Sequence, residues 1–148
     1  MIVSDYMTID VTTLNDDARL LDAALLIRRT GKRHLPILSA QDGKVVGIIS
    51  DRDVSRLSPS VLSEQTQEDY NKIFENTPIT IAMTKTPITI SPWAPVSEAV
   101  QLLYSKKIGG LLVVENGELK GILTVSDMLG LLNELLADGK TTNASGSM

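Results

Sequence analysis

The sequence contains one pattern twice, and this duplication limits the possible folds more than any other feature. Residues 47–54 read Gly-Ile-Ile-Ser-Asp-Arg-Asp-Val, and residues 121–128 read Gly-Ile-Leu-Thr-Val-Ser-Asp-Met. In both copies a glycine opens a short apolar run of strand type and a hydroxyl residue ends it. An aspartate follows three positions later, where a helical pattern begins. The chain is therefore predicted to be a duplicated unit.

The hydroxyl and the carboxylate of each motif have two interpretations. Ser50 with Asp53, and Thr124 with Asp127, have the spacing of a helix capping box, in which each side chain bonds the other residue's amide. At a strand-to-helix corner the same aspartate could also face a cleft and accept hydrogen bonds from two neighbouring hydroxyls, such as those of a ribose. The helix start would offer free amides and a positive dipole end to a phosphate. The two roles can coexist.

The repeat extends well beyond the two motifs. Met7-Thr8 matches Met83-Thr84, and further positions match at the same offset: Thr13 with Thr89, Ala18 with Ala94, Ala23 with Ala99, Leu26 with Leu102, and Leu35 with Leu111. The register then changes, because the turn that ends at Asp42-Gly43 is longer than the turn that ends at Asn116-Gly117.

Each copy is predicted to fold as a strand, a helix, two strands and a second helix. Opening strands are expected at residues 11–14 and 88–90, followed by helix caps at 15–17 and 91–92. The apolar stripes of the next helices have i, i+3, i+4, i+7 spacing and comprise Leu20, Ala23, Ala24 and Ile27 in one copy and Val96, Ala99, Val100 and Leu103 in the other. These stripes are interpreted as core.

Two strands joined by a turn follow in each copy. Residues 35–38 and 45–50 form the first predicted antiparallel hairpin, and residues 111–114 and 119–124 form the second. Pro36 is expected at the start of its strand, because proline cannot donate to a ladder. One such unit has too little core to stand alone, so two copies are predicted to pack with pseudo-two-fold symmetry as an α/β (α+β) fold.

The chain divides into four predicted segments. The first repeat spans residues 1–57, a helical linker 58–82, the second repeat 83–138, and a disordered tail 139–148. Within the linker, a turn is expected at 57–60 and a helix at 64–75, anchored by Tyr70, Ile73 and Phe74. The final helix is rich in leucine. Its apolar surface is wider than packing within one chain requires, so a homodimer is predicted.

Composition excludes several classes of function. The sequence has no cysteine and one histidine, so thiol catalysis, disulfides and cysteine- or histidine-based metal centres are not expected. The net charge of −4 and the pI of about 4.9 argue against a protein that binds nucleic acid. The N-terminus lacks signal-peptide character, and no apolar run is long enough to cross a bilayer. A cytoplasmic protein without membrane contact is predicted.

These repeats resemble the CBS domain, and two in tandem resemble a CBS pair, or Bateman module. The resemblance rests on the Met-Thr lead-in, on residues 31–36 and on the Gly-apolar-apolar-Ser/Thr-x-x-Asp motif, and it covers residues 1–136. The insertion between the repeats is similar to that of stand-alone bacterial acetoin-utilisation CBS proteins. The resemblance implies a regulatory module that binds adenine nucleotides (AMP, ADP or ATP), S-adenosylmethionine, NAD or a cyclic dinucleotide in clefts between repeats, and that requires no metal.

The resemblance also implies roles for particular residues. Asp53 and Asp127 would hold ribose hydroxyls, with Ser50 and Thr124 beside them. The base edge would meet the backbone after each Met-Thr pair, at Ile9, Asp10 and Val11 and at Lys85, Thr86 and Pro87, and the base would be sandwiched by residues near Leu35-Pro36 and Gly110-Leu111.

The two copies differ in their candidate phosphate ligands. The first has Arg33, His34 and Arg52, for which the alternative is a solvated surface or a pair between Arg52 and Asp51 or Asp53. The second has Gly109, Gly110 and Ser126 at the matching positions, with Leu112 in place of the usual proline. Because a guanidinium pairs with phosphate and glycine cannot, the first cleft is predicted to take the phosphorylated ligand. The second is predicted to be weaker, to take a less charged ligand, or to stay empty.

Two other functional classes remain open. An enzyme is disfavoured, because the sequence has neither a Gly-rich phosphate loop nor a nucleophile elbow, and only His34 is available as a histidine base; no catalytic residue is predicted. A structural dimer or docking module without ligand is the other alternative. The regulated protein partner is not indicated by the sequence.

Overall fold

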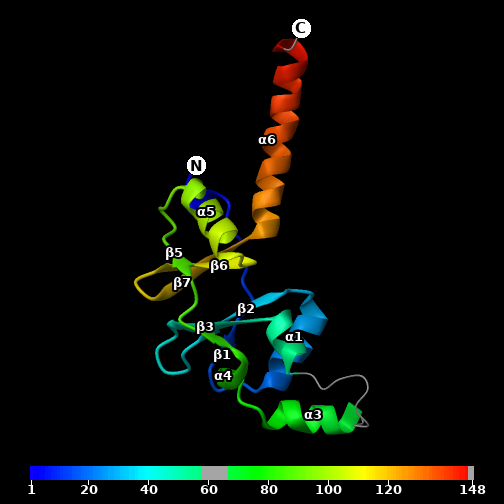
Figure 1. Cartoon of the computed structure of the whole chain (residues 1–148). Coiled ribbons are helices and arrows are strands. Elements are labelled where there is room, and N and C mark those ends of the chain that lie inside the picture. Colours follow the sequence, from blue (N-terminus) through cyan, green and yellow to red (C-terminus); the bar gives the residue numbers. More distant parts are fainter. Residues whose placement is uncertain (58–66, 147–148) are drawn as a thin grey trace. The chain divides into compact units, whose positions relative to one another are not determined.

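The computed structural model describes the backbone of residues 1–57 and 67–146 (Figure 1). Most of the predicted turn at 57–60 and the first residues of the predicted helix at 64–75 lie outside these ranges. The chain divides into two compact units. Residues 10–88 and 116–119 form the Asp53 unit, and residues 1–9, 89–115 and 120–148 form the Asp127 unit. Both units contain the predicted order of strand, helix, strand, strand and helix, so the mixed α/β class is confirmed.

The Asp53 unit is built on one four-stranded sheet. Its elements are β1 (Leu14–Asn15), α1 (Leu20–Thr30), β2 (His34–Leu38), β3 (Val45–Ser50), α2 (Asp51–Arg56), α3 (Gln67–Asn76), α4 (Ile79–Ala82) and β4 (Thr84–Lys85). The strand order is β1-β2-β3-β4, with β1 parallel to β2 and the other pairs antiparallel. The predicted β2–β3 hairpin is confirmed, whereas the opening strand, predicted at residues 11–14, is observed at Leu14–Asn15 and overlaps the prediction only at Leu14.

Apolar side chains from the helices and the sheet form the core of the Asp53 unit. Six buried residues make up its centre: Leu20, Ala23, Leu35, Ile37, Ile49 and Ile79. Phe74 of α3 packs against this centre, which confirms its predicted anchoring role, while Ile73 is 42% exposed. Burying one large aliphatic side chain contributes about 1.5–3 kcal/mol. The core therefore holds α1, α3 and α4 against the sheet that carries the Asp53 corner.

Pro36 lies inside β2 and not at its start as predicted. It pairs with Ile48 of β3 and is fully buried. Strand β1, on the other side of β2, pairs only with Ile37 and Leu38. Pro36 therefore has no partner residue in β1, and its missing N–H interrupts no hydrogen-bond ladder on that side.

Both predicted helix caps precede the observed helix starts. Helix α1 begins at Leu20, and the amide of Arg19 donates to Asp22 Oδ2 at 2.8 Å. Asp16, one of the predicted cap residues, accepts a hydrogen bond from the amide of Ala40 at 3.0 Å and not from an amide of the helix. In the other unit, Ser91 Oγ accepts from the amide of Trp93, and the helix begins only after Pro95. Ser91 therefore stabilises the turn before its helix, whereas Asp16 connects the segment before α1 to the connection between β2 and β3.

The Asp127 unit contains a three-stranded sheet in the order β5-β6-β7. Its elements are the short 3-10 helix η1 (Val3–Asp5), β5 (Thr89–Ile90), α5 (Val96–Lys106), β6 (Gly110–Glu115), β7 (Glu118–Thr124) and α6 (Val125–Gly146). The two-residue connection between β6 and β7 is of hairpin length, as predicted. Val96, Ala99 and Leu103 of the predicted stripe are buried, but Val100 is 45% exposed, so its core assignment is wrong.

Helix α6 continues to Gly146, past Gly139, where the sequence predicts that a disordered tail begins. No proline follows Gly139 to stop the helix, and a backbone that is already helical can extend at one hydrogen bond per residue. The final two residues lie outside the described part of the chain.

The Met-Thr lead-in of each repeat packs with the motif of the other repeat. Thr8 and Ile122 exchange backbone hydrogen bonds of 2.8 and 3.0 Å, and Thr84 of β4 pairs with Ile48 of β3. A Cβ on Gly121 would lie 2.7 Å from the Thr8 carbonyl oxygen. The first residue of each motif is therefore glycine because the lead-in backbone passes too close for a side chain. The compact units consequently differ from the sequential segments 1–57 and 83–138.

Candidate functional site

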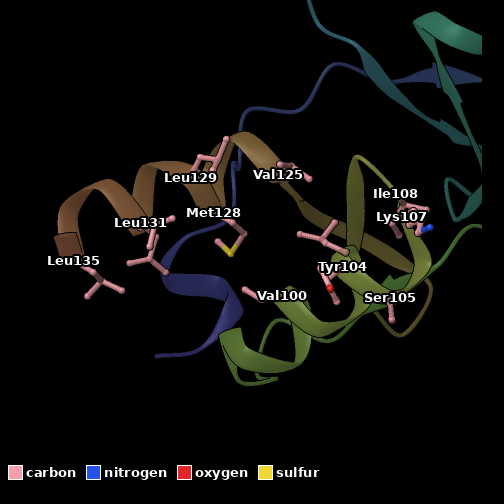
Figure 2. Close-up of a pocket in the computed structure, with 12 residues that line it drawn as sticks. Val100, Tyr104, Ser105, Lys107, Ile108, Val125, Met128, Leu129, Leu131 and Leu135 are labelled. Carbon is pink, nitrogen blue, oxygen red and sulfur yellow. The ribbon is translucent and has the colours of Figure 1, made fainter.

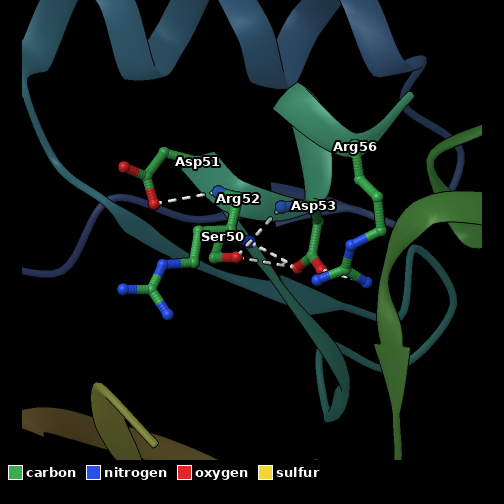
Figure 3. Close-up of polar contacts among 5 residues, drawn as sticks. All are labelled: Ser50, Asp51, Arg52, Asp53 and Arg56. Atoms are coloured by element: carbon green, nitrogen blue, oxygen red, sulfur yellow. Dashed lines mark hydrogen bonds and ion pairs between the residues drawn. The ribbon is translucent and has the colours of Figure 1, made fainter. Parts of the chain in front are cut away.

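The Asp53 corner lies where β3 ends and α2 begins (Figure 3). Asp53 Oδ2 accepts from the Ser50 amide at 2.8 Å and from Ser50 Oγ at 3.0 Å, and the Asp53 amide donates to Ser50 Oγ at 3.2 Å. The predicted capping box is therefore confirmed. The other carboxylate oxygen, Oδ1, lies 3.7 Å from Arg56 Nη1, and the Asp53 side chain is 12% exposed. The cap thus fixes the carboxylate through Oδ2.

The first amides of α2 are already engaged by groups of the protein. The amide of Asp51 donates to the Arg33 carbonyl at 3.0 Å, and the amide of Arg52 donates to Asp51 Oδ1 at 2.9 Å. The Asp53 amide is used by the cap, as described above. The prediction that free amides at this helix start serve a phosphate is therefore wrong, and a phosphate here would depend on basic side chains.

Three predicted basic residues gather around this corner. His34 pairs in register with Ser50 across the β2–β3 ladder, and Arg33 precedes it. Arg33 and Arg52 are exposed, while His34 is partly buried. Figure 3 shows the Arg52 side chain extending away from the Asp53 carboxylate. Arg56 supplies the ion pair to Asp53. A phosphate-binding role for Arg33, His34 and Arg52 stays a prediction.

The environment of His34 disfavours its protonated form. Burial lowers the pKa of His34 from the ordinary value of 6.5, and the positive charges of Arg33 and Arg52 act in the same direction. Asp51 and Asp53 oppose this lowering. His34 is therefore mostly neutral near pH 7 and can offer one N–H to a ligand.

The Asp127 corner has the same cap and a different environment. The Thr124 amide donates to Asp127 Oδ2 at 2.9 Å, and the Asp127 amide donates to Thr124 Oγ1 at 3.1 Å, which confirms the second capping box. Thr8 Oγ1 lies 3.3 Å from Asp127 Oδ1 and donates to it. No role for the Thr8 side chain is predicted from the sequence. The available signal was that its Met-Thr lead-in recurs at residues 83–84.

The predicted base-contacting segments divide between the units. Ile9, 72% exposed, belongs to the Asp127 unit, whereas Asp10 and Val11 belong to the Asp53 unit. Lys32 Nζ donates to the Asp10 carbonyl at 2.7 Å, which holds this segment near the start of β2. Lys85 pairs with Gly47 of β3.

Other predicted base contacts differ in exposure. Thr86 is exposed and has a positive φ of 51°, while Pro87 is partly buried. Leu35, Pro36 and Leu111 are fully buried. Gly110 is partly buried at the start of β6, and Ser126 is exposed near the start of α6. A base-contacting role for these residues stays a prediction.

An apolar groove of about 840 Å³ lies within the Asp127 unit, between α5 and α6 (Figure 2). Its lining includes Val100 and Tyr104 of α5 and Met128, Leu132 and Leu135 of α6. Several of these side chains are also exposed, with Tyr104 at 81%, Leu132 at 47% and Leu135 at 49%. Sequence reasoning identified the leucines of α6, but it assigned Val100 to the core.

Within the part of the chain that the structure describes, no three His, Asp or Glu side chains are grouped so that they could hold a metal ion. Among the described helices, none combines the length and apolar character needed to span a bilayer.

Comparison with known sequences assigns the chain to a family. The CBS domain profile matches residues 3–60 and 78–134, which together make up most of the sequence. The chain therefore belongs to the CBS domain family and carries two CBS domains. A CBS domain-containing protein of Dictyostelium discoideum is 31% identical over 137 residues, which cover 92% of this chain and 94% of that protein.

Solved structures of similar proteins share the fold. A Vibrio cholerae protein named for acetoin utilization (AcuB) is 32% identical, with a TM-score of 0.75 and coverage of 95% of this chain and 96% of that one. The CBS domain pair of protein MJ0100, in complex with 5′-methylthioadenosine and S-adenosyl-L-methionine, is 25% identical, with a TM-score of 0.73 and coverage of 90% and 97%. The resemblance to the acetoin-utilisation type is confirmed.

Some relatives are much longer than this chain. A homoserine O-acetyltransferase of Methanohalobium evestigatum is 29% identical over 133 residues, and the chain spans only 24% of its length. The similarity therefore concerns the CBS pair within a larger protein.

Proposed function

We propose that this protein is a non-catalytic regulatory module that binds an adenosine-containing ligand. Asp53 would hold the ribose hydroxyls through Oδ1, and Arg33, His34 and Arg52 would contact the phosphate of AMP, ADP or ATP. The observation that carries the proposal is the Asp53 corner, where the cap fixes the carboxylate through Oδ2 and basic groups lie nearby. The adenosyl ligands of the similar MJ0100 domain pair support this ligand class.

The Asp127 corner would prefer a less charged adenosyl ligand or bind more weakly. Asp127 Oδ1 already accepts the Thr8 hydroxyl, so a ribose hydroxyl must share or displace this bond. The positions that match Arg33, His34 and Arg52 carry Gly109, Gly110 and Ser126, which cannot neutralise a phosphate. Placement of the ligand in a cleft between repeats stays a prediction, as does a cytoplasmic location.

The signalling step of the proposal is a change in the arrangement of repeats or subunits. A ligand can shift such an equilibrium only by its difference in affinity for the two states. Apolar side chains are exposed along the groove between α5 and α6, and the proposed partner for this surface is a second copy of the chain.

A thermal-shift panel tests the proposed ligand class. AMP, ATP, adenosine and S-adenosylmethionine are added to the native protein and to its Asp53→Ala and Asp127→Ala variants. A ligand present at 100 times its dissociation constant adds about 2.7 kcal/mol of stability. Stabilisation by AMP that Asp53→Ala abolishes and Asp127→Ala retains supports the proposal. Absence of any shift in the native protein favours a docking module without ligand, and ATP turnover that Asp53→Ala abolishes would favour an enzyme.

A further inference from the structure

We propose that Arg56 is a specificity residue at the Asp53 corner, where it favours phosphorylated over unphosphorylated adenosine ligands. This inference rests on the proposed function, and it adds a residue that neither the repeat pattern nor the predicted phosphate ligands include. Arg56 is the last residue of α2 and follows Asp53 by three positions, so the two side chains lie on the same face of the helix.

The two carboxylate oxygens of Asp53 have different roles, and Arg56 lies beside only one of them. Oδ2 accepts both bonds from Ser50, at 2.8 and 3.0 Å. Oδ1 lies 3.7 Å from Arg56 Nη1. Figure 3 shows the Arg56 side chain extending toward the Asp53 carboxylate, while Arg52 extends away from it. The cation therefore lies beside the oxygen that is available to a ribose hydroxyl.

Charge explains why this position matters for selectivity. A carboxylate close to a phosphate repels it, and the repulsion lowers the affinity for a nucleotide but not for a nucleoside. A guanidinium beside the carboxylate offsets this repulsion. The Arg56 side chain is 74% exposed, so it can move aside for a ribose hydroxyl and remain close to the ligand. Arg56 thus lets one site contain both the carboxylate for the ribose and the cations for the phosphate.

The Asp127 corner supplies an internal comparison. The residue three positions after Asp127 is Gly130, which has no charge to offset the carboxylate. Instead, Asp127 Oδ1 accepts a neutral hydroxyl from Thr8. The difference at Arg56 therefore has the same direction as the differences at Arg33 and Arg52, and all three distinguish the two corners by charge.

Calorimetric titration of AMP and adenosine into the native protein and Arg56→Ala tests the inference. Exposed ion pairs contribute up to about 1 kcal/mol, so we expect Arg56→Ala to weaken AMP binding by up to about five-fold and to leave adenosine binding unchanged. Arg56→Lys keeps the charge and should restore the preference for AMP. The effect should also shrink at high salt, because the charges are exposed.

Arg19→Ala serves as the matched control, because it also removes an exposed arginine. Arg19 lies at the start of α1, whereas β2 and the Asp53 corner follow the end of that helix. Eleven residues separate these ends by about 16 Å of helix. This variant should keep the native AMP-to-adenosine ratio. Equal weakening of both ligands by Arg56→Ala, or no change in either, overturns the inference while leaving the proposed function intact. Binding of neither ligand to the native protein overturns the proposed function and the inference with it.

Discussion

Asp53 and Asp127 occupy matching corners, yet the oxygen that each carboxylate does not use for its cap has a different neighbour. Arg56 lies beside Oδ1 of Asp53, and the Thr8 hydroxyl bonds Oδ1 of Asp127. Both caps could be predicted from a local spacing of three residues. The Thr8 contact could not, because it joins residues 119 positions apart and depends on where the lead-in packs.

Replacing Thr8 with valine tests the hydroxyl contact at Asp127. Thr8→Val keeps the shape of the side chain and removes the donor, so we expect the free energy of unfolding to fall by about 1 kcal/mol. Thr84→Val is the matched control in the other lead-in, where the side chain is exposed, and it should change stability by less than about 0.5 kcal/mol. Urea denaturation measures both values. Equal effects of the two variants would contradict a specific role for the Thr8 hydroxyl.

His34 should make stability depend on pH. Burial lowers its pKa in the folded state, so the unfolded chain, with a pKa near 6.5, binds a proton more readily. The free energy of unfolding should therefore fall as the pH drops below about 6.5 and continue to fall until the lowered pKa is passed. His34→Gln should make the profile flatter from about pH 6.5 downward, until the lowered pKa is passed. Identical slopes for the two proteins, measured by urea denaturation, would contradict the assignment.

At the scale of elements, the duplicated pattern was enough to predict their order, because periodicity and turn residues are local signals. The hairpins and the buried helical positions agree with the structure, apart from Val100. The helix starts were less predictable. Asp16 and Ser91 have cap chemistry, but Ser91 bonds within the turn before its helix, and Asp16 bonds the amide of Ala40 in the connection between β2 and β3. Local propensity therefore identified residues whose side chains accept hydrogen bonds from amides, but not which amides donate to them.

Gly121 lies against the lead-in backbone and Gly130 faces open space, so alanine substitutions at these two positions should have opposite effects on stability. Gly121→Ala would place Cβ 2.7 Å from the Thr8 carbonyl oxygen and 2.8 Å from Met7 Sδ, so it should cost about 1–3 kcal/mol of stability. Gly130→Ala meets open space within α6 and should stabilise by about 0.5–1 kcal/mol. Chemical denaturation gives both values. A neutral Gly121→Ala would show that the lead-in does not pack tightly there.

At the scale of the whole molecule, the sequence predicted two repeats but not how their segments are shared. The lead-in at residues 1–9 belongs to the compact unit of the second repeat, and β4 belongs to that of the first. Sequence similarity within the chain identifies which segments are equivalent, but it does not indicate which copy each segment pairs with. Residues predicted to act together, such as Ile9 and Asp10, therefore belong to different units.

The groove between α5 and α6 predicts that the protein associates with itself. Leu132→Glu places a charge on the groove lining, so it should convert a dimer to a monomer at micromolar concentration. Asn133→Glu adds the same charge beside it, outside the groove lining, and should leave the dimer intact. Sedimentation velocity distinguishes the species. A native protein that sediments as a monomer would contradict the proposed dimer.

The central claim is that the Asp53 corner binds the ribose of an adenine nucleotide, and a calorimetric titration of AMP tests it most directly. Asp53→Asn keeps the shape of the side chain but removes one acceptor oxygen and the negative charge, and Asp127→Asn makes the same change at the matching corner. We predict that AMP binds the native protein and Asp127→Asn with similar affinity, and that Asp53→Asn weakens binding by at least about ten-fold, the equivalent of about 1.4 kcal/mol. Unchanged affinity in Asp53→Asn would contradict the account.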